Sequence, residues 1–348
     1  MTPLPPPATG QTRCYNEEGD EIPCGGSGQD GQHRAGVPWP SPRFDVQESA
    51  VLDRLTGLMW TLDAAPSEFP LSWEEALDFI REFNREKGAG RDDWRLPNRN
   101  ELFSLISHVH INPCLGPDAP FQGVFPGYYW TSTTCARLPN QAWYVHLGGA
   151  RLFKGMKHGS YMVWPVRDGR EGAVRLPRTG QRACWNGRGE PIPCDGAGQD
   201  GGIRAGAIPP DPRFESLGET VLDRLTGLTW TRDADLANGP VSWGAALAAV
   251  RSLNEGRFDG ADGWRLPNIR ELASLTDMGS HSPALSSGHP FRGVSDAYWS
   301  STTSIYDPSY AWTLYLMDGP VGVGHKPRPE FYVWAVRGGL NGPFGLED

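Results

Sequence analysis

The sequence lacks an apolar run long enough to cross a membrane, which argues against membrane insertion. It also lacks an excess of basic residues. The net charge is −9, whereas a nucleic-acid-binding protein needs a positive field, so nucleic acid is not an expected partner. The opening MTPLPPPATG shows neither the basic nor the apolar part of a signal peptide. If the protein is exported, its signal has been removed or its route is unusual.

Turn-forming and aromatic residues are abundant. The 348 residues include 44 Gly, 32 Pro and 14 Trp, and 38% of the chain is hydrophobic. A hydrophobic content this high indicates a globular chain rather than a disordered one. The mixture favours short strands joined by long ordered loops over helical bundles.

An internal repeat organises the chain. VLDRLTGL occupies 51–58 and recurs unchanged at 221–228, and WRLPN occupies 94–98 and 264–268. Each repeat is of ordinary domain size, which predicts two tandem domains rather than a solenoid. The predicted divisions are a disordered tail at 1–8, a first repeat with a Cys-hairpin leader at 9–168, a linker at 169–178, a second repeat with its own leader at 179–339, and a tail at 340–348.

The pattern within each repeat predicts an α+β domain. A helix is expected from about 73 to 87, where Ser72 and Glu75 stand in the relation of a capping box. A shorter helix is expected after Asn98. Alternating aromatic and polar residues between Gly-rich turns predict antiparallel strands over 128–167.

An ordered series of motifs resembles a known family. LTGLMWT is followed by a W-x-x-A-L helix, WRLPN-x-x-EL, YWTST and VWPVRDG, and the second repeat has close equivalents. This series is similar to the bacterial family named after the C-terminal domain of the Legionella collagen-like adhesin. The resemblance implies two tandem C-type-lectin-like domains, each with two helices and a twisted antiparallel sheet. That fold supports lectins, adhesins, receptor-binding proteins and a few enzymes, so it does not decide function.

The cysteines are expected to form disulfides, which belong in oxidising compartments. Cys114 and Cys135 occur only in the first repeat, and Ala284 and Ser304 take their places in the second. Joint absence is what a bonded pair predicts. A metal or catalytic thiol beside His108 and His110 is the alternative, although the second repeat lacks both histidines. The predicted pairs are Cys14–Cys24, Cys114–Cys135 and Cys184–Cys194.

Enzymatic activity is not expected. Formylglycine-generating enzymes, which share the implied fold, use a late cysteine pair, but the second repeat has no cysteine after Cys194. No Ser-His-Asp arrangement, metalloprotease motif or phosphate-binding loop appears. Glu101 and Glu271 stand where they would cap helices, three residues after an asparagine. Asp53 and Asp223 are expected to brace turns.

No cofactor is predicted, although calcium is left open because many lectins of this fold bind it. Its candidate ligands are Asp30, Asp200, the pair Asp92–Asp93, and Asp262. None forms a cluster of oxygen ligands in one loop. A structural role for calcium is therefore favoured over sugar coordination.

The aromatic residues divide into core and ligand candidates. Eight tryptophans in the shared parts of the repeats are expected in the core: Trp60, Trp94, Trp130, Trp164, Trp230, Trp264, Trp299 and Trp334. The late segments of the repeats diverge and combine aromatic with cationic groups, which suits glycans through stacking and charge-assisted hydrogen bonds. The predicted ligand residues are Trp143, Tyr144, His146, Arg151, Lys154, Lys157, His158, Tyr306, Tyr310, Trp312, Tyr315, Lys326 and Arg328.

The functional hypothesis is a binding protein or adhesin that is extracellular, on the cell surface or periplasmic. Its expected partner is a glycan, with sulfated or acidic polysaccharides favoured. One alternative is a hypervariable receptor-binding protein with a protein ligand, because the late segment and the closing VRGG resemble such proteins. Another is a structural subunit of a surface filament or coat. A homo-oligomer or filament is left open.

Overall fold

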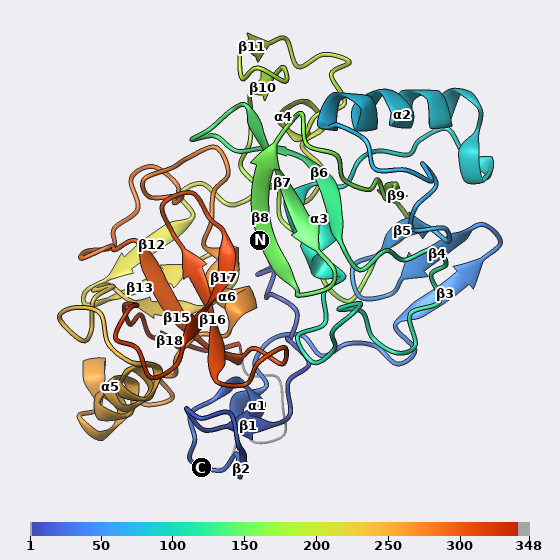
Figure 1. Ribbon diagram of the computed structural model, residues 1–348. Helices are drawn as coiled ribbons and strands as arrows, with labels where there is room; N and C mark the ends of the chain where they lie inside the picture. The colour runs from blue at the N-terminus through green and yellow to red at the C-terminus, as the bar shows by residue number, and fades with distance from the viewer. Residues whose placement is uncertain (1, 340–348) are drawn as a thin grey trace. The chain divides into compact units, whose positions relative to one another are not determined.

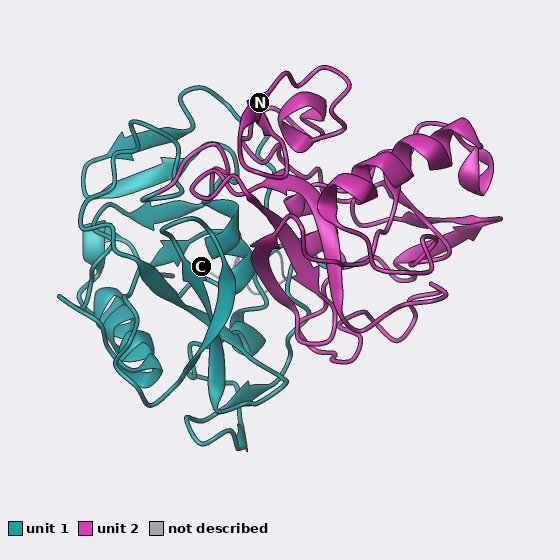
Figure 2. Ribbon diagram, turned by 45° about the horizontal axis from the view of Figure 1, so that its top comes forward, with its two compact units in different colours: residues 1–38, 209–276, 282–348 teal, residues 39–208, 277–281 magenta. Residues whose placement is uncertain are grey.

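The computed structural model describes residues 2–339, and its contacts divide the chain into two compact units (Figure 2). Unit 1 contains 1–38, 209–276 and 282–348, and unit 2 contains 39–208 and 277–281. The first leader (residues 9–38) therefore belongs to the unit of the second repeat's domain. The second leader (179–208) belongs to the unit of the first repeat's domain. The predicted repeat boundaries describe order along the chain, and the compact units group the segments differently.

The terminal and linking segments differ from simple tails. Within residues 1–8, for which the sequence predicts disorder, the amide of Leu4 donates to Leu225 O at 2.7 Å and that of Ala8 to Val37 O at 2.9 Å. In the linker 169–178, Val174 is buried and its amide donates to Leu55 O. The predicted tail at 340–348 lies outside the described residues.

In unit 2, the first repeat's domain holds two antiparallel sheets and two α-helices, and the leader adds a β-hairpin and a short helix (Figure 1). One sheet has the order β3-β4-β5-β9, and in the other β6 pairs with β7 and β7 with β8. The strands and helices are β3 (Phe44–Gln47), β4 (Ala50–Asp53), β5 (Leu58–Thr61), α2 (Trp73–Arg85), η1 (Gly88–Gly90), α3 (Arg99–Ser104), β6 (Tyr128–Thr134), β7 (Gln141–His146), β8 (Arg151–Met156), β9 (Val166–Asp168) and, in the leader, β10 (Cys184–Trp185), β11 (Pro191–Ile192) and α4 (Asp200–Ile203).

Unit 1 repeats this arrangement. Its sheets have the order β12-β13-β14-β18 and the pairings β15 with β16 and β16 with β17. Its elements are β1 (Cys14–Tyr15), β2 (Glu21–Ile22) and α1 (Asp30–His33) in the leader, then β12 (Phe214–Leu217), β13 (Thr220–Asp223), β14 (Thr229–Thr231), α5 (Trp243–Glu255), η2 (Phe258–Gly260), α6 (Ile269–Ser274), β15 (Ala297–Thr303), β16 (Tyr310–Tyr315), β17 (Val321–His325) and β18 (Val336–Arg337). The predicted α+β class is confirmed.

The helices begin where the capping boxes predict. The hydroxyl of Ser72 accepts from the amide of Glu75, whose carboxylate accepts from the amide of Ser72, so α2 starts at the next residue. Asn98 and Glu101 form the same box at the start of α3. Helix α2 ends at Arg85, two residues before the predicted end.

The core consists largely of the tryptophans that the repeat predicted. All eight expected core tryptophans are buried. In unit 2, Trp130 packs with Trp73, Ala76 and Ile80 of α2, which fixes the helix on one end of the β6-β7-β8 face. Asp53 braces its turn as expected, because its carboxylate accepts from the Thr56 hydroxyl at 2.9 Å.

Two of the three predicted disulfides are present, Cys14–Cys24 and Cys184–Cys194. The predicted Cys114–Cys135 bond is wrong, since both residues are buried thiols outside any disulfide. The amide of Cys114 donates to Leu147 O, whereas that of Cys135 donates to Gln141 O. These acceptors lie about 20 Å apart along the direction of β7. A disulfide needs Cα atoms within about 7 Å, so the two thiols are held at opposite ends of a strand.

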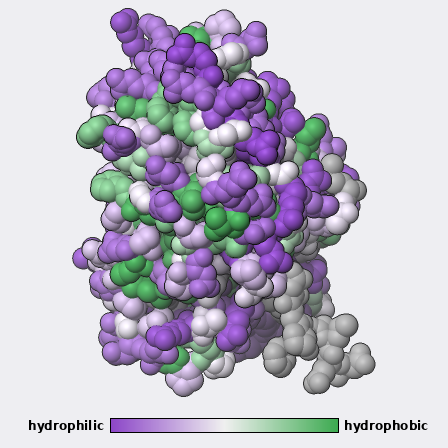
Figure 3. Space-filling view, turned by 90° about the vertical axis from the view of Figure 1, so that its right-hand side faces the viewer, coloured by the Kyte–Doolittle hydropathy of each residue, from purple (hydrophilic) through white to green (hydrophobic). Residues whose placement is uncertain are grey.

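No described helix is long and apolar enough to pass through a bilayer. On the face drawn in Figure 3, hydrophobic residues lie in small patches separated by hydrophilic ones. Scattered apolar residues are ordinary on protein surfaces, whereas a cluster of exposed aromatic rings needs an explanation.

Candidate functional site

An aromatic cluster covers one face of the β6-β7-β8 sheet in unit 2. Tyr128 contacts Tyr144, His146 and Tyr161, with ring centroids 5.0, 4.6 and 5.2 Å away respectively. Phe153 extends the cluster, its ring 6.4 Å from that of Tyr144. We call these five residues the aromatic face.

The strand register places these side chains together. Tyr128 pairs with His146, and Tyr144 pairs with Phe153, so all four project from the same side of the sheet. Tyr161 follows β8 and packs over the sheet where Gly155 leaves room. A Cβ atom at Gly155 would lie 2.5 Å from the Tyr161 hydroxyl oxygen, which a real side chain could not tolerate.

The aromatic face combines exposed rings with neutral polar groups. Tyr128 and Phe153 are each 42% exposed. Burial, followed by the neighbouring tyrosines, raises the pKa of Tyr144 to about 12, so its hydroxyl stays protonated and can both donate and accept. Burial and then the charge of Arg151 lower the pKa of His146, which favours a neutral imidazole. Arg151 is exposed and pairs across the strands with His146, so it places a cation at the margin of the rings.

The equivalent face of unit 1 lacks most of these rings. The strand pairings place Ala297, Thr313 and Gly322 at the positions of Tyr128, Tyr144 and Phe153. Tyr315 and Phe331 remain, with ring centroids 5.8 Å apart, and Phe331 packs in the hydrophobic core. The aromatic face is therefore a property of the first repeat's domain.

Four of the residues predicted to bind ligand are buried, and those predictions are wrong. Trp143 and Trp312 point to the opposite side of their sheets from the aromatic face and lie in the interior. Lys157 and Lys326 are 1% and 0% exposed. A side chain enclosed in this way cannot contact an extracellular polymer.

The two buried lysines instead hold the leaders. The Lys157 ammonium donates to Trp185 O at 3.0 Å and Asn186 O at 3.2 Å, and it lies 3.9 Å from the centre of the Trp73 ring. Lys326 makes the equivalent contacts with the first leader and Trp243. Burial lowers the pKa of each lysine to about 7.

The other predicted residues divide between the aromatic face and separate places. Tyr144, His146 and Arg151 belong to the aromatic face or its margin, and Lys154 lies 5.0 Å from the Phe153 ring. His158 is exposed beyond β8, and Tyr306 is exposed on a loop of unit 1. The remaining three lie in unit 1, where each has a neighbour of its own: Tyr310 contacts His325, Tyr315 contacts Phe331, and Arg328 forms an ion pair with Glu330.

Sequence reasoning missed Tyr128, Phe153 and Tyr161. Tyr128 precedes the shared Tyr-Trp pair of β6, where the second repeat has alanine, so the divergence was visible in the sequence. Phe153 stands in the divergent segment, but only the strand register shows that it faces Tyr144. The position of Tyr161 depends on the space above Gly155, which no local pattern reveals.

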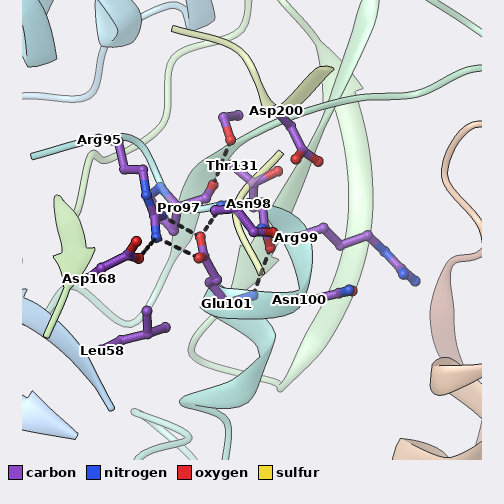
Figure 4. Close-up of polar contacts among 12 residues, drawn as sticks. Leu58, Arg95, Pro97, Asn98, Arg99, Asn100, Glu101, Thr131, Asp168 and Asp200 are labelled. Carbon is purple, nitrogen blue, oxygen red and sulfur yellow. Dashed lines mark hydrogen bonds and ion pairs between the residues drawn. The ribbon is translucent and has the colours of Figure 1, made fainter. Parts of the chain in front are cut away.

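The Glu101 carboxylate has a structural role (Figure 4). It accepts two hydrogen bonds from Arg95, at 2.6 and 2.7 Å, and one from the amide of Asn98. Arg95 also donates to Asp168 at 2.7 Å. A cavity of about 390 Å³ lies beside these residues and is lined by side chains of both charges, including Asp168 and Arg170. The capping role predicted for Glu101 is confirmed.

The calcium candidates Asp30 and Asp200 are buried inside the two units. Among residues 2–339 there is no group of three or more His, Cys, Asp and Glu side chains arranged to hold a metal ion. Asp30 accepts from the hydroxyls of Thr9 and Thr302, each at 2.7 Å. Asp200 accepts from Thr133 and Thr179 at the same distance. These aspartates join the leaders to the domains.

One family of known domains matches the chain twice. The family model described as the Lcl C-terminal domain covers residues 49–167 and 219–337. The two matches span more than half of the chain and coincide with its two repeats. The comparison with curated proteins found no match.

Proposed function

We propose that this chain, which belongs to the Lcl C-terminal domain family and carries two of its domains, binds a polysaccharide outside the cytoplasm. Membership of this family indicates a protein of the surface type. The observation that carries the finer proposal is the aromatic face, where Tyr128 and Phe153 are exposed beside Tyr144, His146 and Tyr161. The location is supported by two disulfides, because such bonds persist in oxidising compartments.

The chemistry of the aromatic face suits a sugar chain. The apolar side of a pyranose ring packs on an exposed aromatic ring, while tyrosine hydroxyls exchange hydrogen bonds with the sugar hydroxyls. Arg151 adds a charge-assisted hydrogen bond to a sulfate or carboxylate on the polymer. The proposed ligand is therefore a polysaccharide with acidic groups, held mainly by stacking and oriented by one cation.

Binding without catalysis is part of the same proposal. The carboxylates that are candidates for general acids hold structural hydrogen bonds instead. Glu101 accepts from Arg95, and Asp53 accepts from Arg43. Burial raises the pKa of the Cys114 thiol to about 11, so a reactive thiolate is disfavoured there.

The test is binding to an array of neutral, carboxylated and sulfated glycans, at low and physiological salt. The variant Y128A/Y144T/F153G installs the residues that the second repeat carries at equivalent positions. We expect it to lose at least about tenfold in affinity, since stacking contacts contribute about 0.5–1.5 kcal/mol each. We expect R151A to lose mainly the salt-sensitive part of binding.

A matched control is Tyr306→Ala, which removes an exposed aromatic ring of unit 1 and should leave glycan binding unchanged. If the triple variant keeps full binding, the glycan site does not lie on the aromatic face. A failure of the wild-type protein to bind any glycan would contradict the polysaccharide proposal. A protein receptor or a role in a surface filament would then be the better hypothesis.

A further inference from the structure

In each unit the leader hairpin meets the first turn of the long helix through one carboxylate and one glycine amide. In unit 1, the amide of Gly244 in α5 donates to Glu17 Oε1 of the first leader at 2.9 Å. In unit 2, the amide of Gly187 in the second leader donates to Glu74 Oε1 of α2 at 2.8 Å. The acid is thus on the leader in one unit and on the helix in the other.

The repeat makes these four residues equivalent in pairs. Glu17 and Gly187 occupy the same position of the two leaders, and Glu74 and Gly244 the same position of the two helices. Each carboxylate lies so close to its glycine that a side chain there would displace it. A Cβ atom on Gly187 would lie 2.7 Å from Glu74 Oε2, and one on Gly244 would lie 2.7 Å from Glu17 Oε1.

If each leader instead docked on the domain of its own repeat, this contact would be unfavourable. A first leader on the first repeat's domain would set Glu17 against Glu74, so two carboxylates would compete for one space and repel each other. A second leader on the second repeat's domain would set Gly187 against Gly244, and no acid would remain to accept from either amide.

Four other polar contacts between leader and domain do not choose between partners. They are almost the same in the two units, because the residues that make them are equivalent in the repeat. The pairs are Asp30–Thr302 and Asp200–Thr133, Gln11–Thr303 and Gln181–Thr134, Asn268–Ala35 and Asn98–Ala205, and Lys326–Asn16 and Lys157–Asn186.

We propose that the leaders are docking segments and that the pairs Glu17/Gly244 and Glu74/Gly187 select their partners. The first leader recognises a second-repeat domain, and the second leader recognises a first-repeat domain. The recognised domain belongs to the same chain or to a second copy of it, since both present the same surface. Discrimination rests on one favourable hydrogen bond to a carboxylate and one repulsive alternative at each leader.

The experiment places three cysteines in the full chain so that the two domains compete for the first leader. E18C lies beside Glu17, and A248C and D78C occupy equivalent exposed positions on α5 and α2, one turn beyond Gly244 and Glu74. The background C114A/C135S takes the residues of the second repeat and removes the native thiols. A flexible bismaleimide of about 11 Å, two helical turns in length, is added, and the linked peptides are identified by mass spectrometry.

We expect E18C to be linked to A248C over D78C by roughly tenfold or more, the change in an equilibrium constant that one charge-assisted hydrogen bond can produce. In E17G/G187E the acids are exchanged between the leaders, so the preference should shift toward D78C. Adding E74G/G244E exchanges the acids of the helices as well and should restore the link to A248C.

Each result decides the proposal. If the variant with all four substitutions again links preferentially to A248C, the proposal is supported even where E17G/G187E folds poorly. A merely structural defect would not be repaired by two further changes. A product of twice the chain mass, linked to A248C, supports it and shows docking on a second copy. An unchanged preference in a folded E17G/G187E variant, or preferential linkage of the unexchanged protein to D78C, overturns it.

Discussion

The carboxylate of Asp30 accepts a hydrogen bond from the hydroxyl of Thr302, which lies 272 positions further along the chain. Thr9 donates to the same carboxylate oxygen. Both contacts lie inside unit 1, so a carboxyl group of the leader is buried between its own segment and the domain of the other repeat. Asp200, Thr133 and Thr179 form the same arrangement in unit 2.

The buried aspartates predict a stability that falls as the pH rises from about 4 to 6. Burial raises the pKa of Asp30 and of Asp200 from 3.8 to about 6, so in this range the folded state binds more protons than the unfolded state. The stabilisation is fully present below the unfolded pKa and is lost as the pH passes the folded one. Each carboxyl should contribute on the order of 3 kcal/mol.

Urea unfolding of wild type and D30N/D200N at pH 4.5, 5.5 and 6.5 isolates this contribution from that of other carboxylates. The free-energy difference between wild type and variant should move in favour of the variant as the pH rises. Asp45→Asn, at an exposed position, serves as control and should leave the pH profile unchanged. Parallel profiles for wild type and the double variant would show that the buried carboxyls do not titrate in this range.

Local chemistry could be read from the sequence, and long-range packing could not. The capping boxes at Ser72 and Asn98 are complete within four residues, so the helix starts were predictable. The burial of Lys157 depends on a leader hairpin about thirty positions away, whose partner domain no local pattern identifies. The joint replacement of Cys114 and Cys135 in the second repeat predicts a bond between them, but their separation depends on which ends of β7 they flank.

Lys157→Met should leave glycan binding intact and lower the stability of the leader. The aliphatic stem is replaced by one of similar shape, whereas Trp185 O and Asn186 O lose their donor. Two carbonyls without that donor should reduce the free energy of unfolding by about 1–3 kcal/mol. Glycan affinity and the urea midpoint are to be measured on the same preparation, with Arg151→Ala as the variant that weakens binding without this stability loss. A loss of glycan affinity in Lys157→Met with no change in stability would show that Lys157 belongs to the ligand site.

The protein should contain two thiols that lie outside any disulfide. Titration with a thiol reagent after denaturation, without reductant, is expected to give two equivalents in the wild type and none in C114A/C135S. The folded protein should react slowly, because both thiols are buried and burial raises the pKa of Cys114 to about 11. The double variant takes the residues of the second repeat and should change stability by less than about 1.5 kcal/mol. If the wild-type protein has no titratable thiols, Cys114 and Cys135 are bonded to each other and the third disulfide exists.

Glu271→Gln should cost more stability than Glu101→Gln, although both residues cap equivalent helices. The Arg265–Glu271 pair is enclosed, with side chains 1% and 0% exposed, and Arg265 otherwise donates to the carbonyl of Gly338. Removing the negative charge leaves a buried guanidinium without its ion-pair partner, a change that costs about 3–5 kcal/mol where the partner is deleted outright. Arg95 keeps a second carboxylate, Asp168, when Glu101 is replaced. We therefore expect a loss near the lower end of that range for Glu271→Gln and about 1–2 kcal/mol for Glu101→Gln, from urea unfolding at pH 7. Combining Asp168→Asn with Glu101→Gln should raise the loss of stability to that expected for Glu271→Gln. Equal losses for the two single variants would show that Asp168 does not compensate for the missing charge.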